Sequence, residues 1–261
     1  MDLLLKDKVF IVTGGARGIG AGICQVLAGE GAVPVIADRN VVAGTALIEQ
    51  LLAAGCAAHF VPVELTDPES CRQAIAQVLT LTNGRIDGLV NNAGVNDGVG
   101  LEHGDYERFM ASLHKNLVHY YLITHHALPA LKASKGAIVN ITSKTAETGQ
   151  GGTSAYSAAN GGRNALTREW AVELLPYSIR VNAVVVAECW TPMYAEWLSS
   201  LPDPEQKRLE ITQRIPLDHR MTTTEEIGNT VAFLLSEKSS HTTGQLIHID
   251  GGYVHLDRAI G

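Results

Sequence analysis

The sequence predicts an α/β fold, in which one doubly wound parallel sheet of about seven strands carries helices on both faces. Short apolar runs alternate along the chain with longer amphipathic segments, which is the pattern of strands joined by helices. With 261 residues, 46% hydrophobic and 18% charged, the chain is long enough to bury one large core. We therefore expect residues 1–261 to form a single domain.

The elements follow from the apolar pattern in order. Strands are predicted at residues 9–12, 33–37, 58–61, 88–90, 137–141, 180–185 and 246–249. The longest helices are predicted at about 106–131 and 154–175. Segment 188–220 is interrupted by prolines and has less regular periodicity. We interpret it as a substrate lid, because loops beyond the carboxyl ends of the strands build the ligand crevice in such sheets.

Charge and cysteine usage exclude several classes of function. The formal net charge is −7 and there is no basic run, which argues against a nucleic-acid partner. The four cysteines, Cys24, Cys56, Cys71 and Cys189, are scattered without zinc-site spacing, so reduced thiols are the simplest interpretation. There is no signal-peptide pattern and no apolar run long enough to span a bilayer. We expect a cytoplasmic protein with no membrane partner.

A glycine-rich turn follows the first predicted strand. Its sequence is Thr13-Gly14-Gly15-Ala16-Arg17-Gly18-Ile19-Gly20, and helical spacing of apolar residues resumes directly after it. Glycines allow a tight turn and a close approach of backbone to phosphate, while the N-terminus of the following helix attracts the anion. The turn therefore predicts a Rossmann-type site for the pyrophosphate of a dinucleotide.

Asp38 ends the second predicted strand and lies 18 residues beyond Gly20. A carboxylate there can accept hydrogen bonds from both adenosine ribose hydroxyls and would repel a 2′-phosphate, which favours NAD. Arg17 and Arg39 leave NADP open, because a guanidinium at either place could pair with that phosphate.

Several motifs, taken together and in order, resemble the short-chain dehydrogenase/reductase family over essentially the whole chain. They are Thr13-Gly14-x-x-x-Gly18-Ile19-Gly20, Asn91-Asn92-Ala93-Gly94, Asn116, Ser143 and Tyr156. The resemblance implies that Ser143 orients the substrate oxygen, Tyr156 passes the proton and Asn116 holds a water in the relay. It also implies the cofactor contacts, which together with those above are Gly14, Arg17, Gly18, Ile19, Gly20, Asp38, Arg39, Glu64, Leu65, Asn92, Ala93, Gly94, Tyr156, Asn160 and Thr191.

Two positions depart from the family pattern. A tyrosine phenol has a pKa near 10 and needs a nearby positive charge to ionise at neutral pH, and the family supplies a lysine four residues after the tyrosine. This chain has Asn160 there. We expect Asn160 to bind ribose hydroxyls, Lys144 or Lys115 to be possible substitute cations, and Asn160→Lys to raise activity at neutral pH. In addition, Val186-Ala187 stands where the family has Pro-Gly.

The local sequences around the expected crevice resemble bacterial L-fucose dehydrogenases, which oxidise the anomeric hydroxyl of a sugar to a lactone. The matching segments are Ser143-Lys144-Thr145-Ala146, Gly149-Gln150-Gly151, Ala187-Glu188 with Thr191-Pro192-Met193-Tyr194, and the tail from Asp250 to Arg258. Polar side chains suit a polyol, whose hydroxyls need matched partners. The candidate substrate residues are Asn96, Ser143, Lys144, Gln150, Glu188 and Trp190.

Other interpretations stay open. A 3-oxoacyl or steroid reductase would share this frame with a more apolar lid, and a chain lacking the lysine could act as a dinucleotide-binding sensor or scaffold. Adjacent His125 and His126, and the pair His248 and His255, show no recognisable ligand spacing, so we expect no metal. By resemblance, segment 253–260 and the two long helices favour a homotetramer, or a homodimer.

Overall fold

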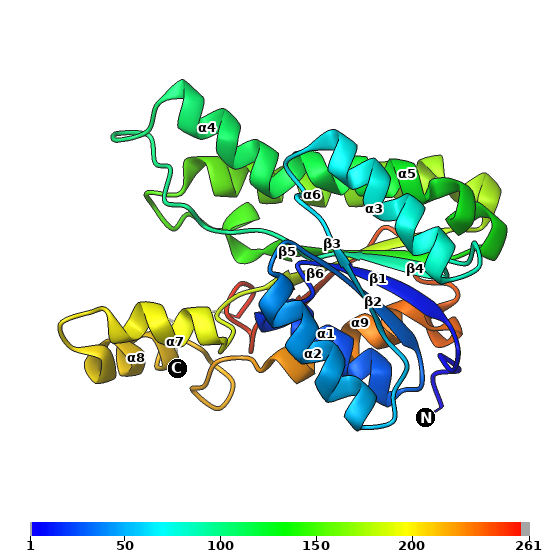
Figure 1. Cartoon of the computed structure of the whole chain (residues 1–261). Helices are drawn as coiled ribbons and strands as arrows, with labels where there is room; N and C mark the ends of the chain where they lie inside the picture. The colour runs from blue at the N-terminus through cyan, green and yellow to red at the C-terminus, as the bar shows by residue number, and fades with distance from the viewer. Residues whose placement is uncertain (1, 257–261) are drawn as a thin grey trace.

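The computed structural model describes residues 2–256 as one α/β domain built around a seven-stranded sheet (Figure 1). All neighbouring strands run parallel, in the order β3-β2-β1-β4-β5-β6-β7. The strands are β1 Val9–Thr13, β2 Val33–Asp38, β3 His59–Pro62, β4 Gly88–Asn91, β5 Ala137–Ser143, β6 Arg180–Val186 and β7 Leu246–Ile249. The predicted fold class is confirmed, and every predicted strand is present within one or two residues of its expected ends.

Helices cover both faces of this sheet. In Figure 1, α1, α2 and α9 lie on one side of the strands and α3, α5 and α6 on the other. The helices are α1 Gly18–Gly29, α2 Val41–Ala53, α3 Pro68–Leu81, α4 Tyr106–Leu113, α5 His119–Ser134, α6 Ser154–Glu173, α7 Pro192–Ser199, α8 Pro204–Thr212 and α9 Thr224–Leu235. Each layer buries its own apolar cluster against the sheet.

Strand β1 shows why the chain forms this sandwich. Its side chains alternate between the two clusters: Phe10 and Val12 pack on the side of α1 and α9, while Val9 and Ile11 pack on the side of α3 and α5. All four are at most 6% exposed, as expected for a central strand covered on both faces. The strand order reverses between β1 and β4, and this switch point is where such sheets bind ligands.

The helix predicted at 106–131 is interrupted. Helix α4 ends at Leu113, a π-helical turn spans His114–Val118, and α5 then continues to Ser134. Apolar periodicity does not reveal a π-helical turn, because it inserts a residue without breaking the helical path. Such turns are frequent at functional sites, and this one carries Asn116.

The predicted lid, 188–220, contains α7 and α8, which Figure 1 shows beside the sheet rather than on either face. Leu198, Ile215 and Met221 form a small apolar cluster there, separate from the two that pack on the sheet. All four cysteines are unpaired thiols. Within residues 2–256, none of the helices combines the length and apolar character that crossing a bilayer requires.

Candidate active site

The turn after β1 is shaped to expose backbone N–H groups. Gly14 and Gly18 adopt positive φ angles of 63° and 54°, and α1 starts at Gly18. Its N-cap residue, Arg17, makes no side-chain capping hydrogen bond, and the first turn holds no acidic residue. The first N–H groups of α1 are therefore left without a capping side chain at the positive end of the helix dipole, which fits an anionic pyrophosphate.

Close packing fixes the shape of this turn. A Cβ on Gly20 would lie 2.1 Å from the carbonyl oxygen of Gly14 and 2.7 Å from the Asn92 amide nitrogen. The Asn92 side chain donates to the carbonyls of Thr13 and Gly14, at 2.9 and 3.2 Å. Asn92 therefore ties the end of β4 to the glycine-rich turn, so its contribution to the dinucleotide site is structural.

Gly20→Ala should weaken nucleotide binding strongly and lower the unfolding temperature, because the methyl group meets backbone that cannot move aside. Gly29→Ala is a matched control on the same helix, since a Cβ at Gly29 meets nothing within 4 Å. It should stabilise the protein by up to about 1 kcal/mol. Nucleotide titration and thermal unfolding of both variants check this prediction. Equal nucleotide affinity and equal unfolding temperature in Gly20→Ala and Gly29→Ala would contradict it.

Asp38 is held beside the same turn. One carboxylate oxygen accepts the Ala16 N–H at 3.1 Å and the other accepts the Asn40 N–H at 2.9 Å. Both oxygens retain lone pairs, so the side chain is oriented and can still accept from ribose hydroxyls. The glycine-rich turn and Asp38 together fit a dinucleotide.

Arg39 and Glu64, both expected near the adenosine, contact each other. The Arg39 guanidinium lies 3.6 Å from the Glu64 carboxylate and its side chain is 78% exposed. Hydrogen bonds from the Thr66 hydroxyl and N–H, with Arg39 adding to them, lower the pKa of Glu64. Arg39 therefore has a carboxylate partner already, which reduces its availability to a 2′-phosphate.

The remaining expected cofactor residues surround the turn. Thr191 caps the N-terminus of α7 and lies against Gly18, where a Cβ would be 3.5 Å from its methyl group. The Ala93 N–H donates to the Thr13 hydroxyl. Ile19 and Leu65 are partly buried against the two sheet clusters, while Arg17 and Gly94 are exposed. The first part of the predicted lid, at Thr191, is thus in contact with the predicted dinucleotide site.

Ser143 and Tyr156 come from adjacent segments. Ser143 is the last residue of β5, and Tyr156 lies in the first turn of α6, which packs on β5 and on the short 3₁₀ turn Lys144–Ala146. The Ser143 hydroxyl accepts hydrogen bonds from the N–H and hydroxyl of Thr145, at 3.3 and 3.1 Å. Both side chains are half-buried at the carboxyl edge of the sheet.

Asn116 is more constrained than expected. It is fully buried, its side-chain oxygen accepts the Val95 N–H at 2.7 Å, and its amide nitrogen donates to Ser112. Its backbone carbonyl accepts the Arg163 Nε at 2.5 Å. Each oxygen of Asn116 therefore has one protein partner and a second lone pair, and its role in holding a relay water stays a prediction.

Arg163 is the residue that sequence reasoning missed. It is 2% exposed, and within residues 2–256 it forms no ion pair with a carboxylate. Its guanidinium donates to four oxygens, which belong to Asn116, Ile141, Asn160 and Ala93. It therefore joins the π-helical turn, β5, α6 and the end of β4. Burial, with the charge of Arg163 adding to it, lowers the pKa of His119 to about 3.

The helical spacing could have revealed this arginine. Tyr156, Asn160 and Arg163 lie at positions i, i+4 and i+7 of α6, and hence on one face. That face also buries Thr167 and Trp170. A charged residue in the middle of a buried face is rare enough to indicate a special role.

The Asn160 side chain is buried and hydrogen-bonded within the protein. It is 0% exposed, its amide nitrogen donates to the Tyr156 carbonyl at 2.9 Å, and its oxygen accepts from Arg163 at 3.0 Å. Both polar atoms of its side chain thus bond within the protein, and the binding of ribose hydroxyls by Asn160 stays a prediction. The reason is the neighbouring guanidinium, which attracts the amide oxygen inward.

Neither expected substitute cation is free. Lys115 is half-exposed and pairs with Asp97 at 3.5 Å. Lys144 is 7% exposed, forms an ion pair with Glu188 and lies 4.0 Å above the Tyr253 ring. The charge of each lysine is balanced by its carboxylate.

The expected substrate residues separate into two groups. Lys144 and Glu188 meet beside Ser143, and Glu188 also accepts the Tyr194 hydroxyl at 2.8 Å. Burial, followed by the adjacent Glu188, raises the pKa of Tyr194. By contrast, Asn96 and Gln150 are exposed and Trp190 is 46% exposed, so the structure does not bring these three into the buried polar cluster.

Comparison with known proteins supports one family. The family model described as enoyl-(acyl carrier protein) reductase matches residues 14–254. An L-fucose dehydrogenase of Rattus norvegicus is 34% identical, covering 95% of this chain and 89% of its own length. A trans-4-hydroxycyclohexanecarboxylate dehydrogenase of Sinomonas cyclohexanicum is 36% identical, covering 95% and 93%. The crystal structure of Cj0485 dehydrogenase superimposes with a TM-score of 0.94 at 44% identity, covering 99% and 98%.

Proposed function

The chain belongs to the short-chain dehydrogenase/reductase family, and from that premise we propose that it oxidises the anomeric hydroxyl of an L-fucose-like sugar to a lactone with NAD. The observation that carries the choice of substrate is the buried polar cluster of Lys144, Glu188 and Tyr194 beside Ser143. An ammonium, a carboxylate and a phenol supply both donors and acceptors for sugar hydroxyls. These groups already pair with one another, and sugar hydroxyls can extend that network with further hydrogen bonds, whereas an acyl chain or steroid offers none.

The protein residues handle the proton. A dinucleotide held at the glycine-rich turn and Asp38 would supply the acceptor for the hydride of the carbon that bears the hydroxyl. The Ser143 hydroxyl orients the substrate oxygen, and the side-chain oxygen of Tyr156 takes the proton from that oxygen as the carbonyl forms. The substrate thus loses one hydrogen with two electrons as the hydride and a second hydrogen as the proton. This is the balance that the oxidation of an alcohol to a carbonyl requires.

Arg163 serves as the cation of this site in place of the family's lysine. It is a positioning residue: its four hydrogen bonds hold the segments that carry Tyr156, Asn116 and Ser143 in one arrangement. This arrangement favours a working enzyme over a sensor that merely retains the fold.

NAD is the preferred cofactor in this proposal. Asp38 is oriented toward the turn by two backbone N–H groups and would repel a 2′-phosphate. Arg39, one of the two candidate partners for that phosphate, lies 3.6 Å from the Glu64 carboxylate. NADP should therefore give a much lower kcat/KM than NAD.

The active form is proposed to be a homotetramer or a homodimer. Val172 on α6 is 67% exposed. A cavity of about 80 Å³ between α5 and α6 has a mixed lining of Tyr121, Leu128, Trp170 and Leu174 with the polar Thr124, His125 and Glu173. Apolar side chains at such a surface suit contact with a second copy. Part of the tail expected to pack across subunits, 257–260, lies outside the described residues. A monomeric mass in light scattering would contradict this proposal.

The experiment that tests the function incubates the purified chain with NAD or NADP and follows nicotinamide absorbance. The substrates are L-fucose, other aldoses and an alicyclic alcohol in the oxidative direction, and a 3-oxoacyl thioester in the reductive direction. We expect NAD reduction with L-fucose-like aldoses. Turnover of the thioester alone would favour a reductase, and nucleotide binding without any turnover would favour a sensor.

A further inference from the structure

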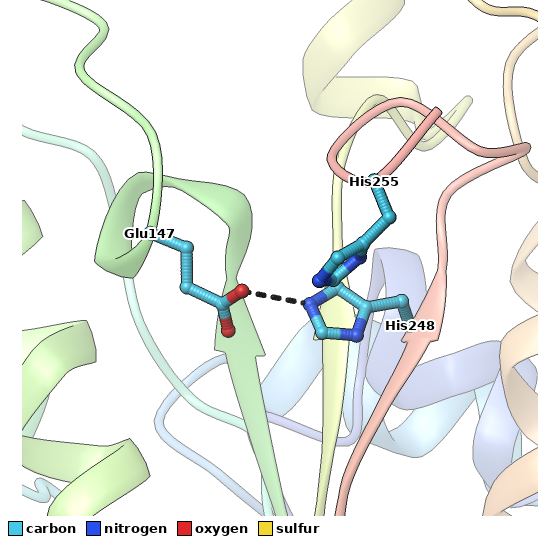
Figure 2. A group of neighbouring side chains, drawn as sticks. All are labelled: Glu147, His248 and His255. Atoms are coloured by element: carbon cyan, nitrogen blue, oxygen red, sulfur yellow. Dashed lines mark hydrogen bonds and ion pairs between the residues drawn. The ribbon is translucent and has the colours of Figure 1, made fainter. Parts of the chain in front are cut away.

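Three residues from distant parts of the sequence converge outside the proposed hydride-transfer site. Glu147 follows β5, His248 lies on β7 and His255 lies on the segment after it, and Figure 2 shows their side chains turned toward one another. The potential ligand atoms of all three lie within 4.8 Å of one another. We propose that these residues form a site for a divalent metal ion of the zinc class.

The chemistry of the group suits such an ion. Two imidazoles and one carboxylate are ligands that zinc accepts, at about 2.0–2.2 Å from the metal. Tetrahedral bonds of that length place the ligand atoms about 3.4 Å apart. The His248 Nε2 is already 3.0 Å from the Glu147 carboxylate, and the ring centroids of His248 and His255 are 4.3 Å apart. A small rotation of the exposed His255 ring closes the remaining distance.

The surroundings provide support for Glu147 and an open coordination position. The Asn164 amide donates to the other oxygen of Glu147 at 3.4 Å, a contact that orients the carboxylate. The side chains of His248 and Glu147 are 18% and 26% exposed, and His255 is exposed. Water can therefore complete the coordination shell, and the ion can enter from solvent.

The position of the site gives the ion a structural consequence. Lys144 precedes Glu147 by one turn, Tyr253 precedes His255 by two residues, and Lys144 lies over the Tyr253 ring. An ion bound by Glu147 and His255 would hold together the two segments that enclose Lys144. Metal binding should therefore raise the unfolding temperature, because a ligand that binds only the native state stabilises it.

Sequence spacing gave no indication of this site. The histidines are seven residues apart and the carboxylate lies about a hundred residues earlier, so no short motif exists. We expected no metal for that reason, and the proposal departs from that expectation. The parallel pairing of β5, β6 and β7 is what brings Glu147 and His248 to the same edge of the sheet.

The test titrates the metal-free, untagged full chain with Zn²⁺ by calorimetry, without nucleotide or substrate, so that its outcome is independent of the proposed function. We expect one site per chain and a rise in unfolding temperature. Glu147→Gln and His248→Ala should each weaken zinc binding at least tenfold. The glutamine has nearly the same shape as the glutamate and can still form a hydrogen bond with His248. His125→Ala is the matched control, because His125 also lies beside another histidine and should leave affinity unchanged.

Equal zinc affinity in the wild type, Glu147→Gln and His248→Ala would overturn the proposal. So would an equal loss of binding in His125→Ala, since that would indicate general binding to surface histidines. Thermal unfolding of each variant without metal verifies that it is folded before its affinity is compared.

Discussion

Tyr156→Phe should lower kcat for sugar oxidation by about a hundredfold to ten-thousandfold, while the affinity for NAD changes little. The substitution removes only the phenolic oxygen, which in this account takes the proton from the substrate hydroxyl. The ring, which is half-buried at the start of α6, keeps its packing. Steady-state kinetics and nucleotide titration of the same preparation measure both quantities.

Tyr121→Phe is the control for this prediction. Tyr121 lies on α5, is 54% exposed and stacks on His125. Its hydroxyl has no part in the proposed reaction, so kcat should be unchanged. A Tyr156→Phe enzyme that retains more than about a tenth of wild-type kcat would show that another group carries the proton.

Asn160→Lys should lower the free energy of unfolding. From the sequence alone we expected only a gain in activity at neutral pH. The Asn160 oxygen accepts from the buried Arg163 guanidinium at 3.0 Å, and a lysine would replace that acceptor with a second positive charge. Two like charges 4 Å apart interact by about 4 kcal/mol at an effective dielectric constant of 20. Chemical denaturation should therefore give a free energy of unfolding lower by roughly 2–4 kcal/mol.

Arg163→Leu should also destabilise the protein, for the opposite reason. The leucine would leave buried oxygens without donors, foremost the carbonyl of Asn116, at about 1–3 kcal/mol for each. The segments that hold Tyr156 and Asn116 would lose their shared contact, so kcat should fall by about tenfold or more. KM for NAD should change less, because Arg163 has no proposed contact with the nucleotide.

The double variant Asn160→Lys with Arg163→Leu distinguishes these effects. One cation remains in the buried site, so both the repulsion and part of the unmet hydrogen bonding are relieved. Its free energy of unfolding and its kcat should exceed those of either single variant, with a coupling energy of at least about 1 kcal/mol. Additive losses would show that Arg163 does not replace the lysine.

The sequence was sufficient for the parts of the molecule that depend on local pattern. Buried parallel strands are continuous apolar runs, so β1 and β6 were found nearly to the residue. The glycine-rich turn was equally clear, because Gly14 and Gly18 are needed where φ is positive. Asp38 was placed correctly beside that turn for the same reason, since it ends the neighbouring strand.

The parts that were missed depend on contacts between distant segments. Three of the four oxygens to which Arg163 donates lie 22 to 70 residues earlier in the chain, and no local pattern encodes those partners. The inward turn of Asn160 is a consequence of that arginine. The backbone likewise stays helical through the π-helical turn at Asn116, so the pattern over 106–131 was interpreted as one continuous helix.

The transfer of deuterium from L-fucose labelled at the anomeric carbon tests the central claim most directly. The account predicts that incubation with the wild-type protein and NAD gives the lactone and reduced nicotinamide carrying one deuterium, detected by mass spectrometry, and that Tyr156→Phe gives almost none. Bound nucleotide that acquires no label from L-fucose or from any other labelled alcohol would contradict the assignment of this chain as a sugar dehydrogenase.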